Sequence, residues 1–351
     1  MEVGGEPISR VQALAEAGLS QVPPQYIQPP NNRPQHSPTA TPHTIPVIDL
    51  FKFDPTHLSS IRETIGKASS EWGAFHVTNH GVSTTLLNQI KTMGLTFFNH
   101  CPVNDKLTYS CDPHSFASQG YGSRMLLNEN DTVVLDWRDY FDHHTLPLSR
   151  RDTSRWPHFP SDYRKTVANY SDEMNALAKK LLGLISESLG LRSSYIEDAV
   201  GEVYQNITIS YYPPCPQPDL TLGLQSHSDM GAITLLIQDD VGGLQVLKDE
   251  QWITVHPLSD AILVILADQT EIITNGKYRS SIHRAITNAT QARLSVATFH
   301  DPAKAVKISP ASELVNGASP RYREVVYGDY VSSWYTEGPD GKRNIDLLLL
   351  N

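Results

Sequence analysis

The feature that most constrains the fold of this chain is a block of short, β-branched segments between residues 203 and 300. Each segment is rich in Ile, Val, Thr and Leu, and turns that contain Pro, Gly or Asp separate it from the next. Strands repeated at this spacing favour a sandwich or a barrel over alternating β-α-β units. The segments are NITISYY (206–212), AITLLI (232–237), LQVLK (244–248), WITVHP (252–257), AILVILA (261–267) and RLSVATF (293–299).

Helical patterns lie outside this block. Between residues 163 and 189, apolar side chains recur at steps of three and four, which is the spacing of a helix that faces a core. A shorter helical pattern covers 8–17, and the proline-dense stretch 23–46 is typical of an extended arm. We therefore predict an all-β core with flanking helices.

The chain is expected to form one structural unit with four regions. An N-terminal helix and proline-rich arm occupy 1–44, and an α/β region packed on the core occupies 45–200. The core of short strands occupies 201–305 and is expected to contain the functional site. A C-terminal helical cap, with a helix over 322–335 and an apolar tail that docks on the body, occupies 306–351.

Charge and cysteine content exclude several classes of partner. The formal net charge is −10 and no basic tract is present, so neither nucleic acid nor an anionic membrane is an expected partner. The 3 cysteines form no C-x-x-C pair, and the N-terminus lacks the pattern of a secretory signal. Apolar runs are too short to cross a bilayer. The expectation is a cytoplasmic monomer that acts on a small molecule.

A possible metal site lies inside the β-rich block. In a strand, His227 and Asp229 point to the same side, and His283 is the best candidate for a third ligand. Two imidazoles and one carboxylate leave positions open on a metal, an arrangement that suits iron(II). An H-x-D pair alone has little weight, because a chain with 14 histidines contains about one by chance.

A second motif strengthens this interpretation. Arg293 and Ser295 follow ten residues after His283 and again lie at i and i+2 of a predicted strand. An arginine fork binds a carboxylate with two hydrogen bonds, and the serine hydroxyl adds a donor on the same side. Because the neighbouring residues are apolar, a buried arginine here needs an anion, and a bound dicarboxylate is a suitable one.

At this point the sequence resembles a known family, the plant-type 2-oxoglutarate/iron(II)-dependent dioxygenases, most closely the anthocyanidin synthase and flavonol synthase branch. The resemblance covers nearly the whole chain from about residue 8 onward. It implies a distorted double-stranded β-helix, or jelly roll. The shared stretches are WGAFHVTNHGV (72–82), QGYG (119–122), LDWRDYF (135–141), ISYYPPCPQPDLTLGLQSHSD (209–229), GGLQVLKDEQWITVHP (242–257), NGKYRSSIHR (275–284) and RLSVATFHDP (293–302).

The resemblance also implies an activity and roles for residues. The enzyme would use iron(II), O₂ and 2-oxoglutarate, with ascorbate as reductant, to hydroxylate or desaturate a small plant metabolite such as a phenolic or a hormone-like acid. His227, Asp229 and His283 match the metal ligands. The matches to the 2-oxoglutarate site are Arg293, Ser295, Tyr212 and Ser210, where Ser210 stands in place of an asparagine common in relatives.

On the substrate side the chain departs from its flavonoid-oxidising relatives. Asp142 replaces an aromatic residue, Thr208 a lysine and Asp301 a glutamate, so a flavonoid substrate is not expected. The predicted substrate pocket comprises Tyr140, Asp142, Thr208, Phe299, Asp301 and Arg124.

Two further features near this pocket leave alternatives open. Arg124 and Asp139 either contact substrate or pair with each other. His143 and His144 are interpreted as a polar rim of the pocket, since adjacent residues of a strand face opposite sides and chelate poorly.

Several alternatives to this function remain on sequence grounds. An aminocyclopropane-carboxylate-oxidase-like enzyme keeps the same triad and Arg-x-Ser motif but uses ascorbate and not 2-oxoglutarate. A catalytically silent binding protein could keep the fold as a receptor. Halogenation is disfavoured because Asp229 is present, and a zinc hydrolase does not explain Arg293 and Ser295.

Overall fold

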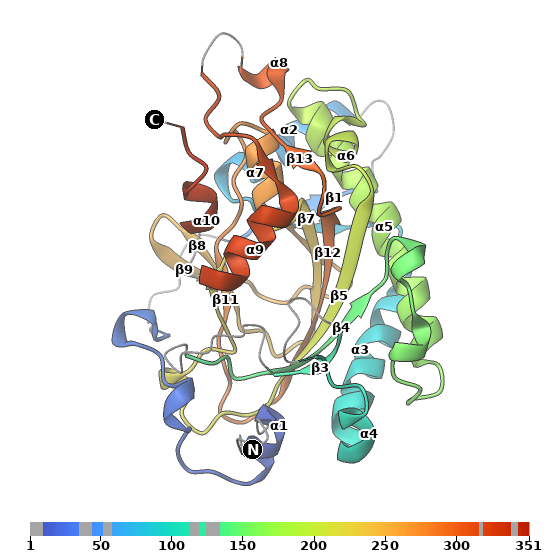
Figure 1. Cartoon of the computed structure of the whole chain (residues 1–351), viewed down its shortest axis with the longest axis vertical. Coiled ribbons are helices and arrows are strands. Elements are labelled where there is room, and N and C mark those ends of the chain that lie inside the picture. Colours follow the sequence, from blue (N-terminus) through green and yellow to red (C-terminus); the bar gives the residue numbers. More distant parts are fainter. Residues whose placement is uncertain are drawn as a thin grey trace, which may run out of the picture.

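The computed structural model describes residues 10–34, 44–51, 58–112, 119–123, 134–315, 319–337 and 343–350. Its centre is a pair of β-sheets, which confirms the predicted all-β core with flanking helices (Figure 1). The larger sheet has eight strands, in the order β1 (Val47–Asp49), β2 (Ala74–Thr78), β10 (Ile262–Leu266), β7 (Ile233–Gln238), β12 (Arg293–Pro302), β5 (Val203–Tyr212), β4 (Asp139–His144) and β3 (Gly120–Gly122). The smaller has four, in the order β6 (Leu224–His227), β11 (His283–Ala285), β8 (Leu244–Lys248) and β9 (Gln251–Thr254).

In the large sheet, the pattern of apolar and polar residues along each strand matches what its two faces contact. All five residues of β10 are buried, and the strand is an unbroken apolar run between β2 and β7. In β12, by contrast, Leu294 and Val296 belong to the apolar core, whereas Arg293 and Ser295 line an internal cavity. Alternation along β12 therefore separates a packing face from a polar face.

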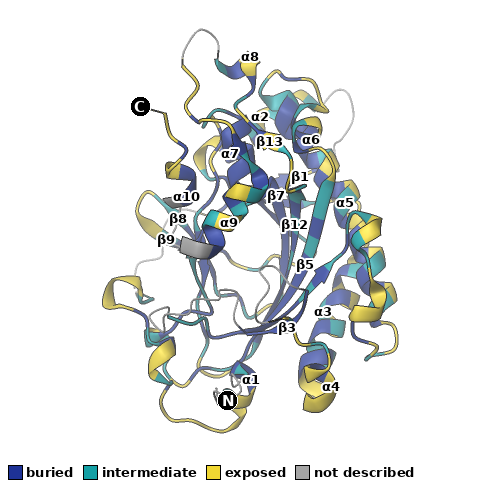
Figure 2. Cartoon of the chain, in the orientation of Figure 1, coloured by how far each residue is buried: buried dark blue, intermediate teal, exposed yellow. Residues whose placement is uncertain are grey.

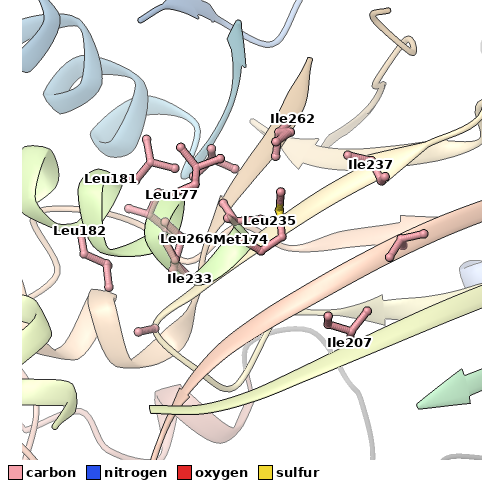
Figure 3. Close-up of a cluster of buried hydrophobic side chains, with 14 of the residues drawn as sticks. Met174, Leu177, Leu181, Leu182, Ile207, Ile233, Leu235, Ile237, Ile262 and Leu266 are labelled. Carbon is pink, nitrogen blue, oxygen red and sulfur yellow. The ribbon is translucent and has the colours of Figure 1, made fainter. Parts of the chain in front are cut away.

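Three long helices cover one side of the large sheet: α2 (Leu58–Glu71), α3 (Thr84–His100) and α5 (Tyr163–Ser188). Figure 3 shows the contact between α5 and the sheet, where Met174 and Leu177 lie near Leu235. Each such side chain contributes roughly 1.5–3 kcal/mol when it is fully buried. The helix predicted over 163–189 is confirmed, and it ends one residue earlier.

Figure 2 shows the same division by burial, with buried residues along the sheets and exposed ones on the outer sides of the helices. The remaining elements lie around this core and are short. They are α4 (Val103–Leu107), α6 (Tyr195–Val200), α7 (Asp268–Ile273), α8 (Ser312–Val315), α9 (Tyr327–Glu337), α10 (Arg343–Asp346), β13 (Lys307–Ile308), β14 (Val325–Val326), and the 3₁₀ turns η3 (Leu148–Arg150), η4 (Thr153–Arg155) and η5 (Pro218–Leu220).

The C-terminal region differs from its prediction at the start of its helix. Its helix, α9, begins at Tyr327, because Val325 and Val326 pair with β13 as strand β14. The apolar tail docks as predicted: Leu348 is buried in the main core, and backbone hydrogen bonds join Leu348 to Arg323 and Leu350 to Arg321, while the side chains of Leu347, Leu349 and Leu350 stay exposed. No helix among the described residues has the length and apolar character needed to span a membrane.

The N-terminal arm lies along the body over its described part. It contains α1 (Val11–Glu16) and two 3₁₀ turns, η1 (Pro24–Tyr26) and η2 (Pro30–Asn32). Tyr26 packs edge-on against the buried Trp137, with ring centroids 5.1 Å apart. Residues 35–43 of the predicted arm lie outside the described residues.

Asp139 fastens this arm to the sheet. Its carboxylate accepts hydrogen bonds from the backbone N–H groups of Val11 and Gln12, at 2.9 and 3.0 Å. The hydroxyls of Ser123 and Tyr121 donate to the same carboxylate, at 2.5 and 3.2 Å. Asp139 does not line the cavity, so a contact with substrate is excluded for it. The alternative partner, Arg124, lies outside the described residues.

We expect Asp139→Ala to lower the free energy of unfolding by about 3 kcal/mol, because four buried donors lose their acceptor. Urea denaturation followed by circular dichroism measures this change. Asp162→Ala is the matched control, since Asp162 is exposed and caps α5 without a side-chain hydrogen bond. Equal unfolding midpoints for the two variants would contradict the anchoring role.

Candidate metal centre and active site

Two short strands of the small sheet bring the predicted metal ligands together. β6 ends at His227, and β11 begins at His283, its direct partner in the antiparallel register. The imidazole centroids lie 4.3 Å apart. Asp229 Oδ1 lies 3.5 Å from His227 Nε2 and 3.8 Å from His283 Nε2. One ligand atom from each residue lies within 4.8 Å of the others, in the one such His/Cys/Asp/Glu group found among the described residues.

Asp229 reaches this position from a loop and not from a strand, which corrects the sequence interpretation. Pairing of β6 stops at His227, and the backbone carbonyl of Asp229 then accepts a hydrogen bond of 2.9 Å from the N–H of Asp268. The i, i+2 spacing still brings the two side chains to the same point, with Asp229 Oδ1 and His227 Nε2 3.5 Å apart.

Backbone carbonyls fix the tautomers of both imidazoles. His227 Nδ1 lies 2.8 Å from the carbonyl oxygen of Gln225, and His283 Nδ1 lies 3.1 Å from that of Ser281. A carbonyl can only accept, so each Nδ1 carries the proton and each Nε2 keeps its lone pair. Both lone pairs are therefore available to a metal beside Asp229, the pattern expected of metal-binding histidines.

Charge states agree with metal binding. Burial opposes ionisation of Asp229, but the charges of His283 and His227 and a 2.6 Å hydrogen bond from Thr234 Oγ1 outweigh it and lower the pKa to about 2. Burial, and then His227, lowers the pKa of His283 to about 4. An ionised carboxylate and a neutral imidazole are the forms that ligate metals, so the donor set fits iron(II).

At the start of β12, Arg293 faces the same cavity with an incompletely satisfied guanidinium. Its Nη2 donates to Gln238 Oε1 at 3.0 Å, and its Nη1 lies 3.4 Å from Ser295 Oγ. Its Nε is buried and has no hydrogen-bond partner among the described residues. No described carboxylate lies within 4.0 Å of it either. A buried cation without an anionic partner is costly, so this site fits an anionic ligand.

Tyr212 and Ser210, which were also predicted for the 2-oxoglutarate site, lie beside Arg293. The guanidinium of Arg293 sits 4.7 Å over the ring of Tyr212, which is opposite it in the β5–β12 register. Burial opposes ionisation of Tyr212, yet Arg293 and Arg138 bring its pKa below the usual value. Ser210 accepts a hydrogen bond of 3.1 Å from Arg138 Nη1.

Arg138 is a residue that the sequence analysis missed. It is buried, lines the cavity, and lies 5.4 Å over the ring of Tyr140 and 4.0 Å from Asp136. The sequence signal that could have identified Arg138 is its position two residues before Tyr140. A strand period of two carried through LDWRDYF indicates that both residues face the same side.

The cavity joins these groups in a space of about 180 Å³. Predicted substrate-pocket residues line it wherever the structure describes them, and Arg124 lies outside the described residues. The predicted residues that line it are Tyr140, Asp142, Thr208, Phe299 and Asp301.

His143 is not on the pocket rim, which corrects that prediction. It is fully buried on the helix side of the sheet, with Nδ1 2.8 Å from the Ile207 carbonyl oxygen and Nε2 3.1 Å from the Tyr163 hydroxyl. Its side chain belongs to the aromatic core under α5. His144 points the other way, with Nε2 4.0 Å from Asp142 Oδ2, so the expected opposition of the two histidines is confirmed.

Three more cavity residues were not foreseen. Asn206 lies two positions before Thr208 on β5, so the strand period could have identified it. Trp334 and Tyr335 come from α9 and close the cavity from the opposite side. No local pattern marks them, because their contact depends on how the C-terminal helix folds back.

Two family models match the chain. The 2OG-Fe(II) oxygenase superfamily matches residues 204–302, and the model of the non-haem dioxygenase in morphine synthesis N-terminal region matches residues 45–160. The first match contains all the residues of the metal group and the arginine of β12.

Relatives cover almost the full length. Jasmonate-induced oxygenase 1 of Arabidopsis thaliana is 39% identical over 350 residues, covering 97% of this chain and 86% of that protein. Leucoanthocyanidin dioxygenase of Petunia hybrida is 37% identical over 325 residues, covering 89% and 75%. A crystal structure described as JOX2 in complex with 2OG, Fe and JA is 38% identical, covers 99% of both chains, and superposes with a TM-score of 0.90.

These similarities confirm the predicted fold, the distorted double-stranded β-helix, since they extend over the two sheets and the helices that cover them. They also agree with a cavity that contains both a metal-ligand group and a cation suited to a dicarboxylate. The chain belongs to the 2OG-Fe(II) oxygenase superfamily and is an oxidoreductase that depends on 2-oxoglutarate and iron.

Proposed function

We propose that His227, Asp229 and His283 hold iron(II) and that Arg293, Ser295 and Tyr212 hold 2-oxoglutarate, with Ser210 supporting them. The observation that carries this proposal is the meeting of both groups in one cavity. The His/Asp group offers ligand atoms within 4.8 Å of one another, and Arg293 offers a buried Nε without a partner among the described residues.

When bound, iron(II) with 2-oxoglutarate and O₂ supplies the oxidising chemistry, in which the co-substrate leaves as succinate and CO₂. The chain supplies position. The carbonyls of Gln225 and Ser281 keep both imidazoles in the metal-binding tautomer, and Thr234 holds the second oxygen of Asp229. Trp334 and Tyr335 cover the cavity and exclude bulk water from the reacting groups.

The substrate is a small plant metabolite, hormone-like or phenolic, in keeping with relatives named as jasmonate-induced oxygenases and leucoanthocyanidin dioxygenases. Ascorbate serves as reductant. A monomer suffices, because one chain contributes every group of the site. The cytoplasm is the proposed compartment, and the free thiols of Cys101, Cys111 and Cys215 agree with a reducing environment.

Succinate release by the purified protein with iron(II), ascorbate and 2-oxoglutarate tests this function against a panel of phenolics and plant hormones. Substrate-stimulated succinate is the expected result, and it separates this enzyme from an ascorbate-dependent oxidase that does not consume 2-oxoglutarate. Failure of the metal-loaded protein to bind 2-oxoglutarate would overturn the proposal.

Support of the carboxylate by Thr234 leads to a further prediction. Thr234→Val keeps the shape of the side chain but removes the donor to Asp229 Oδ2. We expect the affinity for the metal to fall about 10–100-fold, the usual effect of losing a partner of a metal ligand. Competition with a chelator measures it, and Thr254→Val on the exposed face of β9 is the control. An unchanged affinity would contradict this role for Thr234.

A further inference from the structure

The cavity face of the large sheet has opposite charges at its two ends. On β12, Arg293 and Ser295 stand at one end, whereas Asp301 stands eight residues further along, roughly 26 Å away at the usual rise of a strand. On the neighbouring strands, Asp142 pairs with Thr208, which in turn pairs with Ala297 of β12. Ala297 lies halfway between Arg293 and Asp301, so carboxyls begin at the middle of the cavity face and continue to the end away from the proposed 2-oxoglutarate site.

Asp301 lies close to the proposed metal ligands. A Cβ at Gly231 would lie only 1.7 Å from Asp301 Oδ1, so this carboxyl rests against the chain two residues after Asp229. A substrate group bound to Asp301 keeps its neighbouring carbon atoms near the metal group, which is where oxidation is expected.

The described structure gives these two carboxyls few donors. Asp142 accepts hydrogen bonds from Thr208 Oγ1, at 2.8 Å, and from the backbone N–H of His143, and it has His144 Nε2 at 4.0 Å. Asp301 accepts from the Tyr327 hydroxyl. Two cations act on these carboxyls. Arg138 lines the cavity and acts on Asp142, and Arg150 acts on both, donates to a backbone carbonyl, stacks at 4.5 Å over Tyr204 and is not among the cavity-lining residues. Among the described residues, neither carboxyl forms an ion pair with an arginine or a lysine.

A third acceptor and an aromatic wall complete this end. The side-chain oxygen of Asn206, which also lines the cavity, is buried and has no hydrogen-bond partner among the described residues. Phe299, Trp334 and Tyr335 line the same space. Aromatic faces attract cations, and more strongly in a desolvated site. Acceptors without donors, beside aromatic rings, favour a ligand that brings positively charged N–H groups.

Electrostatics of the cavity without ligand point the same way. Burial, followed by the charges of Asp229 and Asp142, raises the pKa of Asp301 to about 8, and burial raises that of Asp142 to about 6. Burial and then both carboxylates also raise the pKa of Tyr335, which lines the same cavity. A cation between the two carboxyls relieves their repulsion.

We propose that the substrate of this oxygenase carries a protonated amine, held between Asp142 and Asp301 against the aromatic wall of the cavity. The proposal rests on the function proposed above and names the substrate class of that same site. An ammonium gives charge-assisted hydrogen bonds to both carboxylates, whereas a hydroxyl gives a neutral one and a carboxylate is repelled.

Three probes of the same size test it: tyramine, 2-(4-hydroxyphenyl)ethanol and 4-hydroxyphenylacetate, which differ only in an ammonium, hydroxyl or carboxylate end. Their dissociation constants are measured by calorimetry on the full chain with iron(II) and 2-oxoglutarate, without O₂. We expect tyramine to bind at least about tenfold more tightly than the alcohol, and the carboxylate to bind most weakly. Equal binding of tyramine and the alcohol, a preference for the carboxylate, or no binding of tyramine at about 10 mM overturns the proposal.

Variants then assign the preference to residues. Asp301→Asn and Asp142→Asn should each lower the preference for tyramine over the alcohol by about fivefold or more. Asp162→Asn, on the exposed start of α5, should leave it unchanged. A full preference in both cavity variants overturns the proposal, and the wild-type series decides it alone if either variant fails to fold.

Binding of 2-oxoglutarate, measured in the same preparations, separates this inference from the proposed function. Wild-type protein that binds 2-oxoglutarate but shows no preference for the ammonium overturns the substrate class alone. Wild-type protein that does not bind 2-oxoglutarate overturns the proposed function, and with it this inference.

Discussion

Asp229→Ala is expected to abolish substrate-stimulated succinate formation, with a loss of more than about 100-fold, because even the outer partners of a metal ligand are worth 10–100-fold. Asp229 Oδ1 is the atom that lies close to both His227 Nε2 and His283 Nε2. Without it, only two neutral imidazoles remain as ligands for a divalent cation in a buried site, so the metal itself should be lost.

Metal content and succinate should be measured on the same samples. His256→Ala is the matched control, since it removes an exposed histidine of the β-rich region and should change neither quantity. If the variant loses the metal but still produces the effect of the wild-type protein in the plant, the protein would act as a receptor that binds its ligand without catalysis. A variant that keeps both metal and turnover would show that the three residues do not form the metal site.

The metal group could be predicted because short-range geometry dominates it. His227 and Asp229 are two residues apart, and an extended chain brings such side chains to one side whether or not the strand continues. His283 could be found because it lies in a strand-like stretch that follows the predicted turn at Asn275. In the structure Asn275 has a positive φ of 54°, as such a turn requires. Its direct pairing with His227 in the register is a tertiary fact that no local pattern contains.

Other parts of the site depend on packing between distant elements. His143 stands in a polar sequence, HH after an aspartate, yet it faces the helices and is buried beside Tyr163, which is 20 residues further along. Trp334 and Tyr335 line the cavity only because the C-terminal helix α9 folds back beside the sheets (Figure 1). Periodicity gives the side of a strand or helix on which a residue lies, but not what covers that side.

Arg293→Ala is expected to raise the dissociation constant for 2-oxoglutarate by about 100-fold or more, because removing one partner of a buried ion pair costs about 3–5 kcal/mol. Arg293→Lys keeps the charge but loses the planar fork that matches a carboxylate, so it should bind at an intermediate level. Equilibrium binding to the iron-loaded protein measures both, and Arg192→Ala, an exposed arginine, is the control.

A comparison with 2-oxopentanoate makes this prediction specific for the far carboxylate, since that acid carries a methyl group in its place. Wild-type protein should prefer 2-oxoglutarate over 2-oxopentanoate by about 100-fold, and Arg293→Ala should reduce the preference to a few-fold while leaving metal affinity unchanged. Retention of the preference would move recognition to another arginine that lines the cavity, such as Arg138. Because Arg138 already has the carboxylate of Asp136 at 4.0 Å, whereas no described carboxylate lies within 4.0 Å of Arg293, the geometry favours Arg293.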